Sequence, residues 1–571
     1  MKFATSVFFR LLAAACGAAL TEVLLDFIDC VIVGHVLGEF ALAGLELYLP
    51  VVNTVSAVAL LVAGGTAVLH AEAMGRFDRV RADTVFSTGV VVALLVGLAG
   101  ALVLWFGLDV FLLLFGGEGE VVAAARQYGR VYAAVALFSP VMTLLITMVL
   151  ADGDDAVFTV GSVLSFVVNV ALSWSLAHTV GIAGCAWGTF AAVVVALVCL
   201  LFHFRTRNCS LKFRRQLSAS LAGRILVANP GDALASLLEA VAMLFVNWFV
   251  VRRFGSDVLS VVALVSAVTG LLFVLNGFSN AAQPLVCVYY SERNFKVLRS
   301  FSRLAFGLAV SAGLVIAVLV ELWPSVPTAL LGIDDAPLVP LAERALRIVA
   351  VSYAFLAAFH FLNSYYAFIG EIALSAVISV LRSFVMPVAC VAVGGLLFGL
   401  DGVWFGLSLA LPLALVVFFG ALLLTRRRGT LPFLLPHDRD AALWTWNFVL
   451  STEASCAIAA HVEEILKARG VVGAAAHRAP VIVEELLETV RERNGARKVR
   501  AELTLDLNEG LDIFLRDTGE IFDITDADRH VDSLRAYFVT CAMADIAHRK
   551  NLTTVGFNRN HLRLSADGRA G

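Results

Sequence analysis

Three acidic side chains in the first apolar segment have types and a spacing that could serve ion coupling. Glu22, Asp26 and Asp29 follow an i, i+4, i+7 pattern, so a helix would place them along one face. An ionised carboxylate near the middle of a bilayer costs roughly 2.5 to 3.5 kcal/mol. If it faces a central cavity, it can take up and release a coupling cation as the cavity changes side. The alternative is that these groups lie near the membrane surface or pair with a buried arginine.

Further polar residues interrupt apolar segments later in the chain. Glu239 is the single acid inside the apolar stretch ALASLLEAVAMLFVNWF (233–249), and it is a second candidate for cation binding. Candidate residues for the lining of a substrate cavity are Asn169, Asn363, Tyr365 and Tyr366. Polar residues between membrane helices often only bond across them, so a structural role is the alternative for the whole set.

The composition identifies the class of protein. Of the 571 residues, 60% are hydrophobic and 15% are charged, whereas a soluble chain carries about 25% charge. The chain is therefore a polytopic membrane protein. Its nine cysteines form no CxxC pair, so we predict neither a disulfide framework nor a metal site. The net charge of -3 gives no indication of a nucleic-acid partner.

About twelve apolar segments, each long enough to cross a bilayer, follow one another between residues 6 and 425. Lysine and arginine gather in alternate connections, at positions 76–81, 205–224, 293–299 and 426–428. The positive-inside rule then predicts a multi-pass protein of the cell (inner) membrane with both termini in the cytoplasm.

The apolar region contains an internal repeat. The segment RFDRVR (76–81) aligns with NFKVLR (294–299), and GIAGCAWG (181–188) aligns with GLDGVWFG (399–406), each 218 positions later. The repeat predicts two parallel halves of six helices each, residues 1–215 and 216–430. Paired bundles of this kind recur in alternating-access carriers, and a membrane scaffold without a transport role is the alternative.

The order and spacing of several motifs resemble those of the multidrug and toxic compound extrusion (MATE) family, over roughly residues 6 to 425. The resemblance rests on DCVIVGHVLGEFALAG (29–44), GRFDRVR (75–81), ADGDDAVFTVGSVLSFVVNVALSW (151–174), NAAQPLVCVYYSERNFKVLR (280–299) and SVLRSFVMP (379–387). It implies two bundles that face a central cavity, and antiport of amphipathic, often cationic, organic compounds rather than enzymatic catalysis. It also implies that Asp29, five residues before Gly34, and Glu239 belong to the cation pathway.

The composition changes after TRRRGTLPFLLPHDRD (425–440) to that of a soluble α/β domain, residues 437–571. APVIVEELLETVRERNG (479–495) predicts an amphipathic helix, and KVRAELTLDL (498–507) and GLDIFLRDTGEIFD (510–523) predict paired strands with Leu511, Ile513 and Leu515 on one face. This domain resembles the GHKL-type ATP-binding domain of anti-sigma-factor kinases. The resemblance implies that Glu485 serves as base and magnesium ligand, and that Asp517 with Gly519 reads the adenine amine.

The same domain departs from the GHKL pattern at two places. Thr489 stands where the magnesium-binding asparagine is expected, and the segment 533–539, where a glycine-rich phosphate lid is expected, contains no glycine. Without glycines the backbone amides cannot approach a phosphate closely. We therefore expect a GHKL-like fold with weak or absent ATP hydrolysis, and no cofactor is required. The alternative is an unrelated regulatory tail that binds a cytoplasmic protein.

Taken together, the sequence predicts an all-α polytopic membrane protein of twelve helices followed by a small soluble α/β domain. The expected function is export of cationic organic compounds, driven by a proton or sodium gradient and regulated by the tail. One alternative is a flippase for a lipid-linked precursor, which would need a strongly cationic cavity; Arg382 is the residue that keeps it open. Another is an ATP-sensing receptor without transport, which would need an intact nucleotide site.

Overall fold

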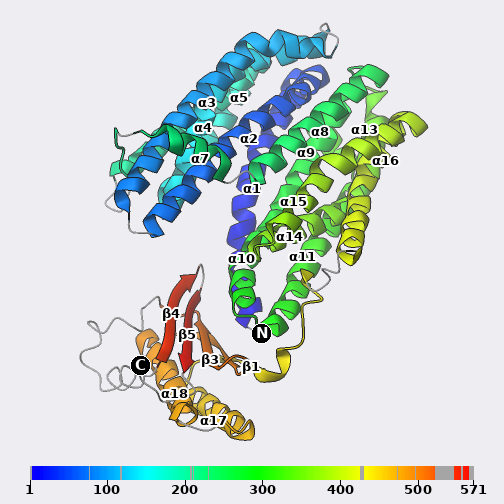
Figure 1. Ribbon diagram of the computed structural model, residues 1–571. Helices are drawn as coiled ribbons and strands as arrows, with labels where there is room; N and C mark the ends of the chain where they lie inside the picture. Colours follow the sequence, from blue (N-terminus) through cyan, green and yellow to red (C-terminus); the bar gives the residue numbers. More distant parts are fainter. Residues whose placement is uncertain are drawn as a thin grey trace.

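The computed structural model is a bundle of long helices with a small α/β domain at one of its ends (Figure 1). It describes residues 3–75, 78–115, 119–152, 154–205, 209, 211–215, 217–228, 231–424, 430–471, 474–495, 497–520, 546–554 and 557–564. The side chains of a few helix and strand residues within these ranges, among them Glu22 and Asp26, also lie outside the description. We call the end of the bundle that carries the α/β domain and the N-terminus the domain end, and the opposite end the far end.

Helices form the whole of the apolar region. Those of the first half are α1 (Phe3–Leu37), α2 (Glu39–Gly75), α3 (Arg79–Leu113), α4 (Glu120–Ala151), α5 (Asp155–Val180) and α6 (Ile182–Phe202). Those of the second half are α7 (Ala219–Ala228), α8 (Gly231–Phe254), α9 (Leu259–Leu271), α10 (Asn276–Ser291), α11 (Phe295–Leu322), α12 (Ser325–Leu330), α13 (Leu338–Ala350), α14 (Tyr353–Phe368), α15 (Ile372–Val380) and α16 (Met386–Leu424). A π-helical segment, Leu381–Val385, joins α15 to α16.

Many of these helices are long and apolar enough to span a membrane. Within the described residues there are nine such runs, or ten if α13 and α14, bent by 45°, count as one span. The run Ile372–Leu424 has 53 residues, more than twice the roughly 20 that one crossing needs. It is also broken at Gly399, where the backbone leaves the helical conformation.

The two halves repeat the same backbone features, as the sequence predicts. Gly181, between α5 and α6, has φ 72° and ψ -150°, and Gly399 has φ 65° and ψ -142°. Gly38 and Gly255, 217 positions apart in the chain, also have positive φ, at 85° and 98°. Because glycine tolerates these conformations and other residues do not, conserving the turn geometry in both halves requires glycine at both places.

The pairing of the basic segments needs a correction of two residues. Asp78 caps the start of α3 by accepting from the backbone of Arg81, and Asn294 caps the start of α11 by accepting from the backbone of Val297. These caps are 216 positions apart, whereas the sequence alignment uses 218. Identical letters misled the alignment, because the cap and not the identity of the following residues determines where each helix begins.

Helix α1 has contacts in both halves. Its later part carries Asp29 toward α5 and α6, whereas its first part packs on the second half at the domain end (Figure 1). A Cβ added to Gly277 of α10 would stand 2.6 Å from the sulfur of Cys16, and the rings of Phe8 and Phe301 are 5.6 Å apart. The close approach at Gly277 requires a residue without a side chain.

The C-terminal domain is one antiparallel sheet with two helices on one face. Its elements are β1 (Leu443–Val449), α17 (Thr452–Ala468), α18 (Ala474–Asn494), β2 (Arg500–Asp506), β3 (Leu511–Asp517), β4 (Ile546–Thr554) and β5 (Phe557–Leu564), and the strand order is β1-β2-β3-β5-β4. The predicted strand pair is β2 with β3, and the predicted helix is α18. Leu511, Ile513 and Leu515 pack together with apolar residues of both helices, which confirms the predicted face.

The other face of the sheet is polar and covers the turn between α10 and α11. Arg516 of β3 is fully buried and forms ion pairs with Glu292 of that turn and with Glu502 of β2. Its guanidinium lies over the ring of Tyr289, 4.6 Å from the centroid. Arg559 of β5 binds Glu292 Oε1 at 2.6 Å. Burial lowers the pKa of Arg516 to about 10, so it remains charged at neutral pH and two arginines enclose one carboxylate.

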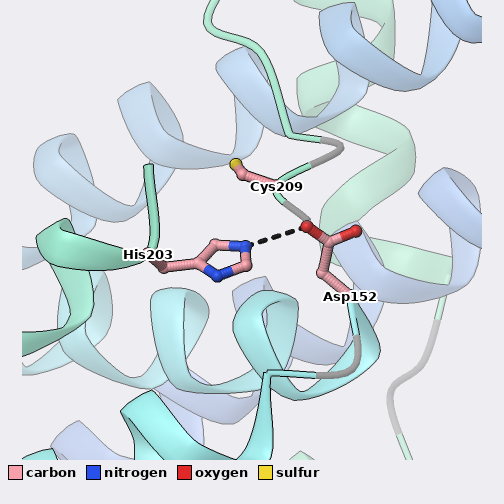
Figure 2. Close-up of side chains that lie close together, drawn as sticks. All are labelled: Asp152, His203 and Cys209. Carbon is pink, nitrogen blue, oxygen red and sulfur yellow. Dashed lines mark hydrogen bonds and ion pairs between the residues drawn. The ribbon is translucent and has the colours of Figure 1, made fainter. Parts of the chain in front are cut away.

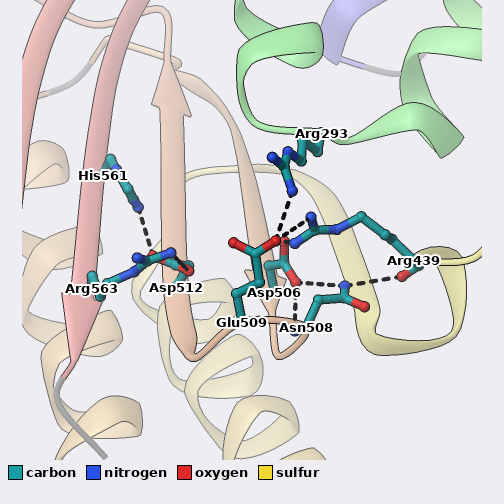
Figure 3. Close-up of polar contacts among 8 residues, drawn as sticks. All are labelled: Arg293, Arg439, Asp506, Asn508, Glu509, Asp512, His561 and Arg563. Atoms are coloured by element: carbon teal, nitrogen blue, oxygen red, sulfur yellow. Dashed lines mark hydrogen bonds and ion pairs between the residues drawn. The ribbon is translucent and has the colours of Figure 1, made fainter.

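More exposed contacts surround this buried ion pair. Arg293 of the same turn and Arg439 both bind Glu509, at 2.7 and 2.8 Å (Figure 3). The start of α1 is attached too, because the backbone N–H of Phe3 donates to Asn447 Oδ1 of β1 at 2.6 Å. The domain therefore holds both α1 and the α10–α11 turn.

We predict that Gly399→Ala destabilises the bundle by about 1–3 kcal/mol, because an alanine at this positive φ is strained. The space beside Gly399 is open, so the cost arises from the backbone alone. Thermal unfolding in detergent measures the effect. Gly420→Ala, also in α16 with open space beside it, is the control and should leave the unfolding temperature nearly unchanged; equal effects of the two substitutions would contradict this account.

Candidate functional site

The carboxylate of Asp29 lies where α1 meets α5 and α6. Its Oδ2 accepts from Asn169 Nδ2 at 3.4 Å and from Thr189 Oγ1 at 3.5 Å. Ser173 holds the amide in place by donating to Asn169 Oδ1 at 2.9 Å. The two contacts to Asp29 are long for hydrogen bonds, so the carboxylate is positioned by neutral donors without being tightly bound by them. Two residues predicted from the sequence, Asp29 and Asn169, thus come together.

Aromatic rings adjoin this carboxylate. Tyr128 of α4 lies close enough to Asp29 to interact with it electrostatically, and its ring stacks on that of Tyr132 with centroids 5.8 Å apart. A carboxylate beside aromatic faces is a chemistry that suits cations. The other two acids predicted on the same helix face, Glu22 and Asp26, have side chains outside the described residues.

In the second half, Glu239 of α8 faces a cationic partner. Its Oε2 lies 3.4 Å from Arg382 Nη2, and Arg382 Nη1 lies 3.2 Å from His360 Nε2. Arg382 belongs to the π-helical segment between α15 and α16, and such segments occur frequently at functional sites because they redirect side chains. Glu239 thus belongs to a mixed-charge cluster, whereas Asp29 is held by neutral groups.

The remaining candidate lining residues take part in helix packing. Asn363 Oδ1 accepts from the hydroxyls of Ser375 and Ser379, at 2.8 and 3.2 Å, which joins α14 to α15. Tyr365 and Tyr366 are buried, with ring centroids 5.6 Å apart. These contacts favour the structural alternative for Asn363, since polar groups bonded across helices are common in membranes.

In the C-terminal domain, Asp517 ends β3 with a buried carboxyl group. Its Oδ1 accepts from the backbone N–H of Gly519 and from Asn558 Nδ2, both at 2.9 Å, and its Oδ2 has no partner among the described residues. Burial raises the pKa of Asp517. An added Cβ at Gly519 would stand 2.5 Å from the side chain of Asn494. The arrangement leaves one carboxyl oxygen able to accept a hydrogen bond from an amine.

The other predicted nucleotide residues lie on α18 or outside the description. Thr489 donates its hydroxyl to the backbone oxygen of Glu485 at 2.7 Å, so this side chain is engaged within its own helix. The expected lid segment, 533–539, lies outside the described residues. The described part of the domain therefore supplies an amine acceptor at Asp517 and no asparagine ligand at position 489.

A group of potential metal ligands lies at one end of the first half. Asp152, His203 and Cys209 each offer a ligand atom, and these atoms lie within 4.8 Å of one another (Figure 2). His203 Nε2 binds Asp152 at 2.8 Å and Nδ1 binds Asp154 at 2.7 Å. A metal ion would have to replace one of these two bonds. In the present geometry the histidine joins the two aspartates of the α4–α5 connection to the end of α6.

Several residues of these sites escaped the sequence analysis. Thr189 and Ser173 are small polar residues of a type that is frequent between membrane helices, so nothing singled them out. Glu292 lies in a short basic connection, and nothing in its surroundings indicated a partner. The alternation of Glu502 and Thr504 with apolar residues does predict a polar face of β2, but not what covers it.

Comparison with known proteins places the bundle in a family. The MatE family model matches residues 14–175 and 233–391, one block in each half. An inward-facing multidrug resistance MATE family transporter of the MOP superfamily is 23% identical over 71% of this chain and 94% of its own, with a TM-score of 0.66. For an outward-facing conformation of such a transporter the values are 23%, 74%, 95% and 0.59.

The MATE multidrug transporter DinF-BH, solved in complex with a small organic compound, is 20% identical over 76% of this chain and 97% of its own, with a TM-score of 0.61. No curated protein sequence matches the chain. At these identities the solved structures show a shared fold, and the family model covers more than half of the residues, in both halves of the repeat. The chain therefore belongs to the MatE family.

Proposed function

We propose that this chain is a cation-coupled antiporter that exports amphipathic, cationic organic compounds by alternating access. The observation that carries the proposal is the Asp29 carboxylate, which neutral donors hold between α1, α5 and α6. Such a group changes charge when it binds a proton or sodium ion, and coupling requires such a change. MATE relatives in inward- and outward-facing conformations support two-sided access, and the complex of DinF-BH supports an organic substrate. The ion gradient supplies the free energy, so the mechanism needs no cofactor.

The proposed topology has twelve crossings, with both termini in the cytoplasm of the cell (inner) membrane. Two observations support a number above the ten apolar spans: α1 is 35 residues long, and Ile372–Leu424 is broken at Gly399. The halves are residues 1–215 and 216–430, and the domain 437–571 then lies in the cytoplasm. The basic connections of the sequence support this orientation.

The charge distribution favours cationic cargo over a lipid-linked precursor. A flippase for such a precursor would need unpaired cationic groups for its phosphates. Arg382 is the cation that kept this alternative open, and it is faced by Glu239. Its positive charge is therefore partly offset where it would be needed.

The tail is proposed to regulate transport through its docked sheet. The support for this role is the buried contact of Arg516 and Arg559 with Glu292, which links the domain to a connection between two membrane helices. The ligand of the domain is proposed to be an adenine nucleotide bound weakly at Asp517, or a cytoplasmic protein.

We predict that Asp29→Asn abolishes ion-coupled efflux but leaves expression and folding intact, because the amide keeps the volume and cannot carry the charge change. Transport into vesicles, with an imposed proton gradient and then a sodium gradient, measures the loss. Glu239→Gln tests the second half in the same assay.

Asp109→Asn is the control for this series, because Asp109 is an exposed residue paired with the exposed Arg126. It should transport at the wild-type rate. Wild-type transport by Asp29→Asn would remove Asp29 from the mechanism, and loss of folded protein in Glu239→Gln would assign that residue a structural role.

We predict that the full-length protein shows little or no magnesium-dependent ATP hydrolysis, because Thr489 lacks the amide ligand and the 533–539 segment lacks glycines. Titration calorimetry with ATP, with and without magnesium, measures binding. Any adenine binding should disappear in Asp517→Asn, whose amide presents a different pattern of donors and acceptors. Tight magnesium-dependent binding followed by turnover would contradict the degenerate site.

We predict that Glu292→Gln weakens the docking of the domain by about 3–5 kcal/mol, because two buried arginines lose their shared carboxylate. Hydrogen exchange of β2 and β3, measured on the full chain, should rise, and the transport rate should change with it. Glu509→Gln removes an exposed carboxylate of the same interface and is the control. Released strands with an unchanged transport rate would refute the regulatory role.

A further inference from the structure

A second buried carboxyl group lies between the two halves near the far end. Glu46, in the second turn of α2, is 1% exposed and lies about 10 Å along the helix from its first residue. Its Oε1 accepts from the hydroxyl of Ser266 of α9 at 3.0 Å. Asn247 of α8 donates to the backbone oxygen of Glu46 at 2.9 Å. Both partners belong to the second half, so Glu46 is a contact between the halves.

This carboxyl group has fewer hydrogen bonds than an ionised carboxylate would need. Its Oε2 is buried without a partner among the described residues, and Ser266 is the one neighbour there that acts on the side chain. On the adjoining helices, Asp29 of α1 has its own partners in the first half, and Arg252 and Arg253 lie in the last turn of α8. An ionised, singly bonded carboxylate buried here would cost several kcal/mol. In this conformation Glu46 therefore carries a proton.

More acidic groups gather at the surface of the same end. Glu39, the first residue of α2, interacts electrostatically with Asp257, Asp334 and Asp335 of the second half. Like charges across a contact repel each other, so loss of protons at this end pushes the halves apart. Glu46 differs from this group because it is buried in the contact and must lose its charge before the contact can form.

We propose that Glu46 is a second proton-binding site, which must be occupied before the halves can close at the far end. The proposal rests on the proposed function, because alternating access requires the halves to separate at that end. Separation removes Ser266 and Asn247 from Glu46 and admits water, in which the carboxyl group releases its proton. The partners Asn169 and Thr189 of Asp29 belong to the first half and α1, so that site need not break when the halves move. The two carboxylates therefore respond to different events.

The test measures closure at the far end without relying on transport. Hydrogen exchange of the segments 39–48 and 259–268 is followed in the purified full chain from about pH 6 to about pH 9, with the intrinsic pH dependence of exchange removed. In the wild type, the corrected exchange should rise about tenfold or more as the proton leaves and the halves open. Glu46→Gln mimics the protonated side chain and should stay protected over the whole range.

Asp29→Asn is the matched variant, because it removes the other carboxyl group and should retain the pH-dependent opening of the wild type. A pH-dependent opening that persists in Glu46→Gln would overturn the proposal, as would an opening controlled by sodium at constant pH. If the wild type opens with pH and Glu46→Gln does not, the proposal is supported even if no gradient drives transport. Absence of gradient-driven transport in the wild type would count against the proposed antiport and not against Glu46.

Discussion

An isolated charge buried in an apolar environment costs several kcal/mol, and each charged group within this chain meets that cost in a different way. Arg516 shares carboxylates with neighbouring strands and with the α10–α11 turn. Glu239 faces Arg382 across two helices of the second half. Asp29 is held by neutral donors, and Glu46 has one hydroxyl partner. Permanent ion pairs suit fixed contacts, whereas weakly held carboxyl groups suit positions where the charge must change.

Much of this architecture is predictable from the sequence because apolar length and glycine positions are local properties. The repeat follows from pairs such as Gly181 and Gly399, whose backbone conformations agree closely in the structure. Strands β2 and β3 follow from the alternation of apolar and polar residues. Asp29 and Asn169 were each singled out by their polarity within apolar segments. Their proximity, however, depends on how three helices pack, and no local pattern specifies that.

The contacts between distant segments are the part that sequence patterns do not predict. Glu46 resembles other acids near helix ends, and its burial arises from Ser266 and Asn247 more than 200 positions later in the chain. Glu292 likewise meets Arg516 and Arg559 only because the domain folds back on the bundle. Burial turns ordinary surface charges into strong constraints, so the same residues have different energies depending on what covers them.

The geometry of β3 gives the proposed regulation a short physical route. Arg516 and Asp517 are successive residues, and side chains alternate across a strand, so one faces the helical bundle and the other faces α18. A ligand that draws the end of β3 toward Asp517 would act directly on the ion pair with Glu292.

The start of α1 is attached to the same sheet through Phe3, and the same helix carries Asp29 farther along. A helix is stiff along its axis, so a displacement of its first turn reaches residues many turns away without local unfolding. The sheet thus grips both a connection of the second half and the helix that bears the coupling carboxylate of the first.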